Sequence, residues 1–540
     1  TIIYDGAGRL KSMEDADNHK TQYEYDLNGQ LTKVIDPLLN YVAYTYDAKG
    51  KRLTARNARG YITKYAYDDN DKLISETDAL DGITRYTYDG EDRVKTIINA
   101  LNHTVATFTY DFKGQVVTVK DALNRETNFS YDAVGNKTSE TNVLNDVVSY
   151  QYDALNQMIK QVDALNQMQL LAYDELGNLI TQTDANLQQT HYAYDALNRH
   201  KETLDAANGT VKQNYNIDGL RTALIDPNNQ TLQFDYDVEG RLLKTTTMDG
   251  NFWQASYNAQ GQISQTTNGR GDVSQYAYDA ASQISLITED FTNISYEYDE
   301  NGNRIKVVDT SLSAPPIPGR TWLYTYDALD RLSSHTDHNG NVIEYKYDAI
   351  GQLTKLIYPD ARQVNYTYDK VGQLTQVVDW ANRQTKYEYD VLGRVSKAVH
   401  SNGLYTQYTY DEVGQLKKQE TKNIISASLI NYDFSYNQLG LMTGETGFDS
   451  QRYQDAGMAA QMGYISDNRL SELLSVGMNS YDADGNMNYG WVNGENRDLN
   501  YDTRNMLTSI HNVGSAVNDF YYDYNPDNQR ISKSENQLHT

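Results

Sequence analysis

Short apolar and aromatic segments alternate with short polar segments along most of this 540-residue chain. Inside the apolar segments bulky side chains recur at every second position, as in YEYD (Tyr23 and Tyr25) and FSYD (Phe129 and Tyr131). A spacing of two places both rings on one face of an extended strand. No window in residues 1–300 keeps apolar residues at the i, i+3, i+4, i+7 spacing of a helix. The pattern therefore predicts a succession of β-strands of about six residues each.

The strands and turns repeat with a period of about 21 residues, anchored on a tyrosine. There are 25 anchors from Tyr4 to Tyr524, and 16 of the 24 intervals between them are 21 residues long. The residue after the anchor is Asp in 20 units, and the fourth residue after it is Gly, Asn or Asp in 24. Because these residues tolerate a left-handed backbone and the Asp can accept local N–H bonds, a tight turn is predicted after each anchor. The signature residues of representative turns are Tyr25, Asp26, Gly29, Tyr46, Asp47, Gly50, Tyr131, Asp132, Gly135, Tyr173, Asp174, Gly177, Tyr347, Asp348, Gly351, Tyr389, Asp390 and Gly393.

A second turn is predicted in the middle of each unit, eleven residues after the anchor, where Asp or Asn recurs. The hexapeptide DALNQM fills both kinds of turn, at Asp153–Met158 after an anchor and at Asp163–Met168 in mid-unit. Each unit is therefore strand, turn, strand, turn, and such short turns impose antiparallel pairing. Roughly 50 strands at about 4.8 Å each would span some 240 Å, whereas open sheets rarely exceed about 10 strands. We therefore expect an all-β fold of about 25 hairpin repeats in a long sheet that coils as a spiral, barrel-like wall or solenoid.

Composition narrows the function classes. The net charge of −26 argues against a nucleic-acid partner, since phosphates would be repelled. No apolar run approaches the roughly 18 residues of a membrane span, and the absence of Cys excludes disulfides and thiolate metal sites. Of the aromatic residues, 47 are Tyr and only 9 are Phe, which suits a half-solvated wall where each hydroxyl stays in water or finds an acceptor. The start TIIYDGAGRL has no initiating Met and no signal-like pattern, so we interpret the chain as an excised fragment or a mature piece.

The motifs of catalysis and cofactor binding are missing from the sequence. It contains no HExxH, G-x-S-x-G, P-loop or dinucleotide fingerprint. Carboxylates are frequent, but the repeat accounts for them as turn formers. Calcium binding by these Asp-rich turns is left open, although the GGxGxD nonapeptide of calcium-binding β-helices is absent. We therefore predict no enzyme and assign no catalytic residue, cofactor or metal site.

Two segments break the period. Residues 311–320 (SLSAPPIPGR) are Pro-rich and are predicted to form a surface loop, or else a plug or partner-binding loop. Residues 444–479 are rich in Gly and Met, and we interpret them as a loop insertion with short helical turns around 454–461 and 469–474, or else as a cap. We divide the chain into a regular wall, residues 1–410, and a continuous but irregular closing section, residues 411–540.

The units YEYDLNGQLTKVID, NFSYDAVGNKTSETN, YKYDAIGQLTKLIYPD and YEYDVLGRVSKAVH resemble the YD repeat of RHS (rearrangement hotspot) proteins. That family includes bacterial polymorphic toxins, the B and C components of Tc toxins, and teneurins. The resemblance covers essentially the whole chain and implies a hollow β-shell. Segments 481–488, 495–510 and 521–533 resemble the sequence that closes such shells, but no DPxGL-type motif follows before Thr540. The self-cleavage chemistry of the family therefore cannot be assigned to residues of this chain.

From the resemblance we expect a structural shell, a monomer, that sequesters a C-terminal toxin or effector domain lying outside this chain. The expected partners are that domain or a protein of a delivery system, and the expected location is secreted or on a cell surface. The alternative is an extracellular adhesion module whose rows of Tyr stack on glycans.

Overall fold

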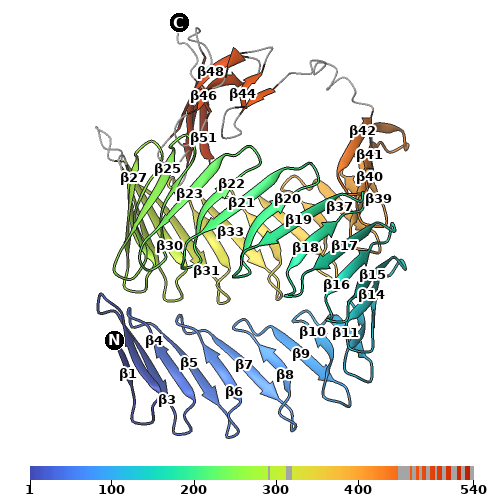
Figure 1. Cartoon of the computed structure of the whole chain (residues 1–540). Helices are drawn as coiled ribbons and strands as arrows, with labels where there is room; N and C mark the ends of the chain where they lie inside the picture. Colours follow the sequence, from blue (N-terminus) through green and yellow to red (C-terminus); the bar gives the residue numbers. More distant parts are fainter. Residues whose placement is uncertain are drawn as a thin grey trace.

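All of the secondary structure in the described residues is β-strand (Figure 1). The structure is a computed structural model, and it describes residues 1–289, 292–311, 319–447, 462–464, 470–473, 477–478, 480–481, 487–492, 495–501, 506–512, 520–524 and 530–535. The predicted all-β fold of hairpin repeats is confirmed. The helical turns expected around 469–474 are wrong in part, because Leu470–Leu473 is a strand; the turns expected around 454–461 lie outside the described residues.

The strands form three sheets, of 42, three and six strands. The first sheet contains β1 (Ile2–Tyr4), β2 (Leu10–Glu14), β3 (Lys20–Tyr25), β4 (Leu31–Ile35), β5 (Tyr41–Tyr46), β6 (Arg52–Arg56), β7 (Ile62–Tyr67), β8 (Leu73–Thr77), β9 (Ile83–Tyr88), β10 (Val94–Ile98), β11 (Thr104–Tyr110), β12 (Val116–Lys120), β13 (Glu126–Tyr131), β14 (Lys137–Thr141), β15 (Val147–Tyr152), β16 (Met158–Val162), β17 (Met168–Tyr173), β18 (Leu179–Thr183), β19 (Gln189–Tyr194), β20 (His200–Leu204), β21 (Thr210–Tyr215), β22 (Arg221–Ile225), β23 (Thr231–Tyr236), β24 (Leu242–Thr246), β25 (Phe252–Tyr257), β26 (Ile263–Thr267), β27 (Val273–Tyr278), β28 (Ile284–Thr288), β29 (Thr292–Tyr298), β30 (Arg304–Ser311), β31 (Arg320–Tyr326), β32 (Leu332–Thr336), β33 (Val342–Tyr347), β34 (Leu353–Ile357), β35 (Gln363–Tyr368), β36 (Leu374–Val378), β37 (Gln384–Tyr389), β38 (Val395–His400), β39 (Tyr405–Tyr410), β40 (Leu416–Lys422), β41 (Ser428–Tyr436) and β42 (Met442–Gly447). The second sheet contains β43 (Met462–Tyr464), β44 (Leu470–Leu473) and β45 (Gly477–Met478), and the third contains β46 (Ser480–Tyr481), β47 (Met487–Val492), β48 (Glu495–Tyr501), β49 (Leu507–Asn512), β50 (Phe520–Tyr524) and β51 (Arg530–Glu535).

Each strand of the large sheet pairs antiparallel with the next strand along the chain, so the sheet is one continuous meander. Pairing across the turn after an anchor tyrosine always shifts in register at that tyrosine. In β3–β4, for example, Glu24 lies opposite Lys33 but Tyr25 lies opposite Leu31. Pairing across the mid-unit turn between β2 and β3 is regular. Each unit of the large sheet therefore contains a β-bulge at its anchor tyrosine, and the mid-unit pairings β10–β11 and β40–β41 carry a second shift. A β-bulge bends the strand and increases the local twist of the sheet.

The sheet is a single layer with little core. The chain exposes 31333 Å², whereas a compact protein of 61.3 kDa would expose roughly 20,000 Å². The tightest cluster of buried side chains consists of Ile294, Val307 and Trp322, on the lengthened strands β29–β31. Elsewhere the two aromatic positions of a strand are half-buried and the residue between them is exposed, as in Tyr65, Ala66 and Tyr67 of β7. One face of the wall is therefore lined by half-buried rings.

The meander coils into two stacked tiers (Figure 1). In Figure 1, strands β1–β11 run along the lower part of the molecule, the chain rises through β14–β16, and the strands of the large sheet from β17 on lie above the first ones. Contacts between residues far apart in sequence fix the pitch of the coil. Mid-unit turns 15–18 and 57–60 lie against post-tyrosine turns 258–261 and 299–302. One turn of the coil therefore takes about 24 strands. We call the first turn of this coil, β1–β24, the first tier, although its strands from β17 on lie in the upper course of Figure 1. The second tier is β25–β42, and the contact between the two tiers is the seam.

Candidate functional site: the turn modules and the seam between tiers

The turn after each anchor tyrosine is built on its aspartate. In the turn after Tyr25, the backbone N–H of Gly29 donates to the Asp26 carbonyl at 3.1 Å, and the Asp26 N–H donates to the Gln30 carbonyl at 3.0 Å. The Asp26 carboxylate accepts the N–H groups of Asn28 and Gln30, both at 2.9 Å. Gly29 has a φ of 85°, which costs a glycine nothing. The Asp and Gly of the predicted signature therefore fix a type I turn followed by a bulge.

The same geometry recurs at the other signature residues. Asp47, Asp132, Asp174, Asp348 and Asp390 accept the equivalent backbone N–H groups. Gly50, Gly135, Gly177, Gly351 and Gly393 have φ values between 85° and 105°. Hydrogen bonds from the side chain and backbone of Asn178 hold the pKa of Asp174 below its usual value.

The hydroxyl of the anchor tyrosine has a specific acceptor. The Tyr46 hydroxyl donates to the backbone carbonyl of Leu31 at 2.7 Å, which reaches back to the preceding unit. Leu31 begins β4 at the bulge, and the ladder between β4 and β5 starts only at Lys33, so the Leu31 carbonyl has no partner on β5 there. The tyrosine therefore satisfies a backbone acceptor that the bulge leaves open.

Twenty anchor tyrosines make this bond in the large sheet. They are Tyr25, Tyr46, Tyr67, Tyr88, Tyr110, Tyr131, Tyr152, Tyr173, Tyr194, Tyr215, Tyr236, Tyr257, Tyr278, Tyr298, Tyr326, Tyr347, Tyr368, Tyr389, Tyr410 and Tyr436. The signature residues thus form local modules spaced along one edge of the wall, each tied to the unit before it, and the structure does not gather them into a shared pocket.

A further position of the module, the fifth residue after the anchor, was missed in the sequence. Arg331 there bonds the Asp327 carboxylate of its own turn at 2.7 Å, donates to the Asp348 carbonyl of the next turn at 3.0 Å, and lies 4.7 Å over the Tyr347 ring. Where the residue is Gln, as in Gln373, its amide donates to the carbonyl of the glycine in the next turn. The recurrence of Arg and Gln at this position was the available signal.

The seam is most elaborate at Arg59, in the mid-unit turn between β6 and β7. Its guanidinium donates to Asp330 at 2.7 Å and to the backbone carbonyls of Asp327 at 2.8 Å and Tyr326 at 2.9 Å. It also lies 3.2 Å from the Asp299 carboxylate, and its side chain is only 13% exposed. One arginine of the first tier therefore contacts two successive turns of the second.

Asp330, the acidic partner of Arg59 in this contact, accepts further hydrogen bonds from side chains of its own tier. Asn301 and Asn303 donate their side-chain amides to Asp330 at 2.8 and 2.7 Å. Burial alone would raise the pKa of Asp330, but these amides and Arg59 hold that pKa below its usual value. Asp330 is therefore kept as a carboxylate that faces the arginine.

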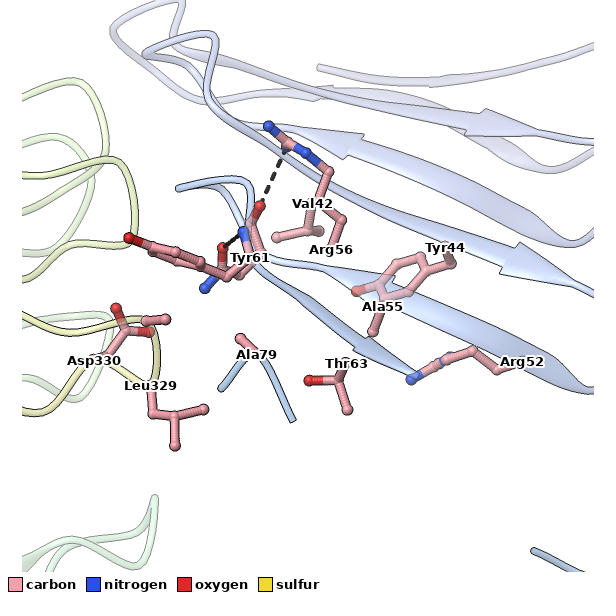
Figure 2. Close-up of a pocket in the computed structure, with 12 residues that line it drawn as sticks. Val42, Tyr44, Arg52, Ala55, Arg56, Tyr61, Thr63, Ala79, Leu329 and Asp330 are labelled. Carbon is pink, nitrogen blue, oxygen red and sulfur yellow. Dashed lines mark hydrogen bonds between the residues drawn. The ribbon is translucent and has the colours of Figure 1, made fainter. Parts of the chain in front are cut away.

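Beside this contact is a pocket of about 440 Å³ that both tiers line (Figure 2). On the first-tier side, the guanidinium of Arg52 lies 4.6 Å over the ring of Tyr44, and that of Arg56 lies 4.2 Å over the ring of Tyr41. Its lining residues are Val42, Tyr44, Arg52, Ala55, Arg56, Asn57, Tyr61, Thr63, Ala79, Ala328, Leu329 and Asp330. Across the described residues no group of three His, Asp or Glu side chains could hold a metal ion.

Comparisons with known proteins agree with this architecture. The model of the teneurin YD-shell family matches residues 75–273 and 254–428, and the model of the RHS repeat matches residues 4–38, 25–63 and 46–80. No curated protein matches the sequence. A search for helices long and apolar enough to cross a membrane finds none in the described residues.

Solved Tc toxin structures share the fold. The crystal structure of TcdB2-TccC3 matches the whole of this chain at 14% identity, with a TM-score of 0.68. The Photorhabdus luminescens Tc holotoxin pore also matches the whole chain at 14% identity, with a TM-score of 0.59. The chain covers only 37% and 38% of the length of those two chains. The family match, which spans more than half of the residues, shows that this chain belongs to the YD-shell family of RHS-repeat proteins.

Proposed function

We propose that this chain is part of the wall of a closed chamber that sequesters a C-terminal toxin or effector domain. The observation that carries the proposal is the single-layer wall, which exposes far more surface than a compact protein of its mass. A one-layer sheet that coils back on itself and is held by a seam is suited to enclosing space.

The size of one coil is compatible with a protein cargo. About 24 strands at about 4.8 Å give a circumference of roughly 115 Å and a diameter of roughly 37 Å. A 100-residue domain has a radius of gyration of about 13 Å. The chamber is therefore of molecular size, and a cargo chain would be confined closely within it.

The cargo and its delivery are proposed by analogy with the similar structures. The matched structures are of Tc toxin complexes, including a holotoxin pore. We propose a toxin or effector domain as the enclosed partner, with a delivery protein as the second, and action outside the producing cell. The wall itself has a structural role in this proposal and no catalytic one.

The glycan-binding alternative is less well supported. Stacking on sugars requires open ring faces, but the anchor rings from Tyr25 to Tyr436 are half-buried. Their hydroxyls are already bonded to backbone carbonyls, as that of Tyr173 is to Met158.

Small-angle scattering tests the chamber directly. We expect a compact particle with a resolvable internal void, and a solid or rod-like profile would contradict the proposal. Enclosure itself is tested by limited proteolysis of a longer polypeptide that carries a C-terminal domain. That domain should survive at protease concentrations that degrade it when it is expressed alone.

A further inference from the structure

The post-tyrosine turns of the first tier form a row that faces away from the second tier, which we call the lower rim. It runs from turn 5–8, between β1 and β2, to turn 237–240, between β23 and β24. The tips of these turns are apolar in most units. The exposed fractions are Leu27 106%, Phe112 90%, Val134 73%, Leu155 70%, Leu176 73%, Leu197 69%, Ile217 95% and Val238 98%.

The tips of the post-tyrosine turns are better covered in the second tier, where these turns meet the first tier at the seam. Val134 and Leu155 of the lower rim occupy the third position of their turns, and Ile350 and Leu439 occupy the same position in turns of the second tier. The quantity compared is the exposed fraction of the side chain. The second-tier residues are 38% and 42% exposed. Leu329 at that position is less exposed still and lines the pocket at the seam. Apolar turn tips are therefore the means by which one tier rests on another, and those of the lower rim lack such a cover in the described residues.

The mid-unit turns show the complementary pattern. In most of the first-tier mid-unit turns that form the seam, the third residue is leucine. These leucines are Leu38, Leu80, Leu101, Leu123, Leu144 and Leu165. The mid-unit turns beyond the seam form what we call the upper edge. Their second residue is a large exposed apolar side chain at Met248, Trp380 and Ile424. Their third residue is polar or small, with Ile425 as the exception. The residues are Ala207, Asn228, Asp249, Arg270, Asn339, Asp360, Ala381 and Asn402.

The contrast separates two kinds of edge. A row of exposed apolar tips is costly in water and marks an interaction surface. A large apolar residue occupies one of the two central positions in eight of the twelve lower-rim turns, but in only three of the nine described upper-edge turns. If projection at a hairpin tip alone explained the lower rim, the two edges would be equally apolar. The turn tips of the lower rim are therefore apolar like those that form the seam. The turn tips of the upper edge are mostly polar or small, as expected for an edge that faces solvent.

We propose that the lower rim is a docking surface for a further tier of YD-repeat wall, whose mid-unit turns carry leucine in their third position. The lower rim continues the sheet that already forms one such seam, so the same contact can be repeated one tier down. A second copy of this chain does not meet the requirement, because the edge it would offer has no leucine in the third position of its turns. The inference rests on the coiled wall and not on what the wall encloses, so its failure would leave the enclosure proposal standing.

A gain-of-function partner tests the leucine requirement. The partner is this chain with its upper edge converted to the seam type by Asn339→Leu, Asp360→Leu, Ala381→Leu and Asn402→Leu. The wild-type chain, fluorescently labelled, is titrated with this partner in sedimentation-velocity experiments. We expect head-to-tail complexes that the wild-type chain does not form with itself at the same concentrations.

Two sets of serine substitutions in the labelled chain locate the contact. The rim variant carries Val134→Ser, Leu155→Ser, Leu176→Ser and Leu197→Ser. The control variant carries Met248→Ser, Ile424→Ser and Ile425→Ser, at upper-edge residues that are 64%, 75% and 78% exposed. We expect binding to weaken at least about 100-fold in the rim variant, since four apolar tips lose their cover, and to stay unchanged in the control.

Three results would overturn the proposal. They are no binding by the leucine-converted partner, an equal loss in the rim and control variants, and equally strong self-association of the wild-type chain. Circular dichroism and scattering of each variant establish that the wall is folded, which is expected because all of the changes lie at turn tips.

Discussion

Replacing Arg59 with alanine should loosen the seam without unfolding either tier. The guanidinium makes two contacts with carboxylates, those of Asp330 and Asp299, and two hydrogen bonds to backbone carbonyls. Taking about 1.5 kcal/mol for each carboxylate contact, because Asp330 is partly exposed, and about 1 kcal/mol for each carbonyl gives about 5 kcal/mol. Ordering the arginine side chain costs about 2 kcal/mol. The net contribution is about 3 kcal/mol, or roughly a 100-fold change in the equilibrium for opening the seam.

Hydrogen exchange at the seam measures this opening directly. The backbone N–H of residue 59 donates across the seam to the Asn301 side chain at 3.1 Å, and it keeps this bond in Arg59→Ala unless the tiers separate. We expect its protection to fall roughly 100-fold, while the strands within each tier keep theirs. Global denaturation is a poorer assay, because a long repeat array does not unfold in two states.

The matched control is Arg93→Ala. Arg93 pairs with Asp89 at 2.7 Å within its own turn, on the lower rim. This variant loses an ion pair of the same chemistry but should leave the protection of residue 59 unchanged. The reasoning is refuted if Arg59→Ala leaves that protection intact, or if Arg93→Ala lowers it equally.

The remaining predictions concern pH, the tyrosine hydroxyls and the turn glycines. Because the pKa of Asp330 is lowered from 3.8, its stabilisation of the seam should be complete above that value and lost as the pH falls through the lowered pKa; scattering that shows the tiers separating already near pH 5 would contradict this. Tyr88→Phe should reduce local hydrogen-exchange protection by about 1 kcal/mol, whereas Tyr86→Phe in the same strand, for which no hydroxyl partner is described, should have little effect; equal effects would count against a specific role of the hydroxyl. Gly114→Ala should cost about 1–2 kcal/mol because its φ is 84° although nothing lies within 4 Å of the new methyl group, and Gly90→Ala, equally uncrowded and without a positive φ, should be neutral or slightly stabilising in the same exchange assay.

The sequence predicted the local structure well because each element is specified by a few adjacent residues. A turn such as the one after Tyr173 needs only its Asp174 and Gly177 within five positions, and both are visible in the sequence. The strands follow from the alternation between successive turns. Even the use of DALNQM in two different turns was readable, since both kinds of turn rely on the same capping by aspartate, at Asp153 and Asp163.

The seam could not be predicted because it depends on the pitch of the coil. Arg59 and Asp330 are 271 positions apart, and which turns meet is decided by twist accumulated over about 24 strands. No single unit carries that information. A partial signal was nevertheless present, since leucine at the third position of the mid-unit turns ends at Leu165, and polar or small residues take that position from Asn186 on, with Ile425 as the exception.

The bond from each tyrosine hydroxyl to the preceding unit bears on how the gene for such a wall can change in length. Removing one whole unit leaves every remaining carbonyl with a donor, because the next tyrosine takes the place of the lost one. A partial deletion would leave a backbone acceptor without its donor. Insertions and deletions of about 21 residues should therefore be tolerated locally. They shift the tiers against each other by two strands, however, so a residue such as Arg59 would face a different turn. Natural variation in the number of repeats should accordingly occur in whole units and be accompanied by changes at the seam.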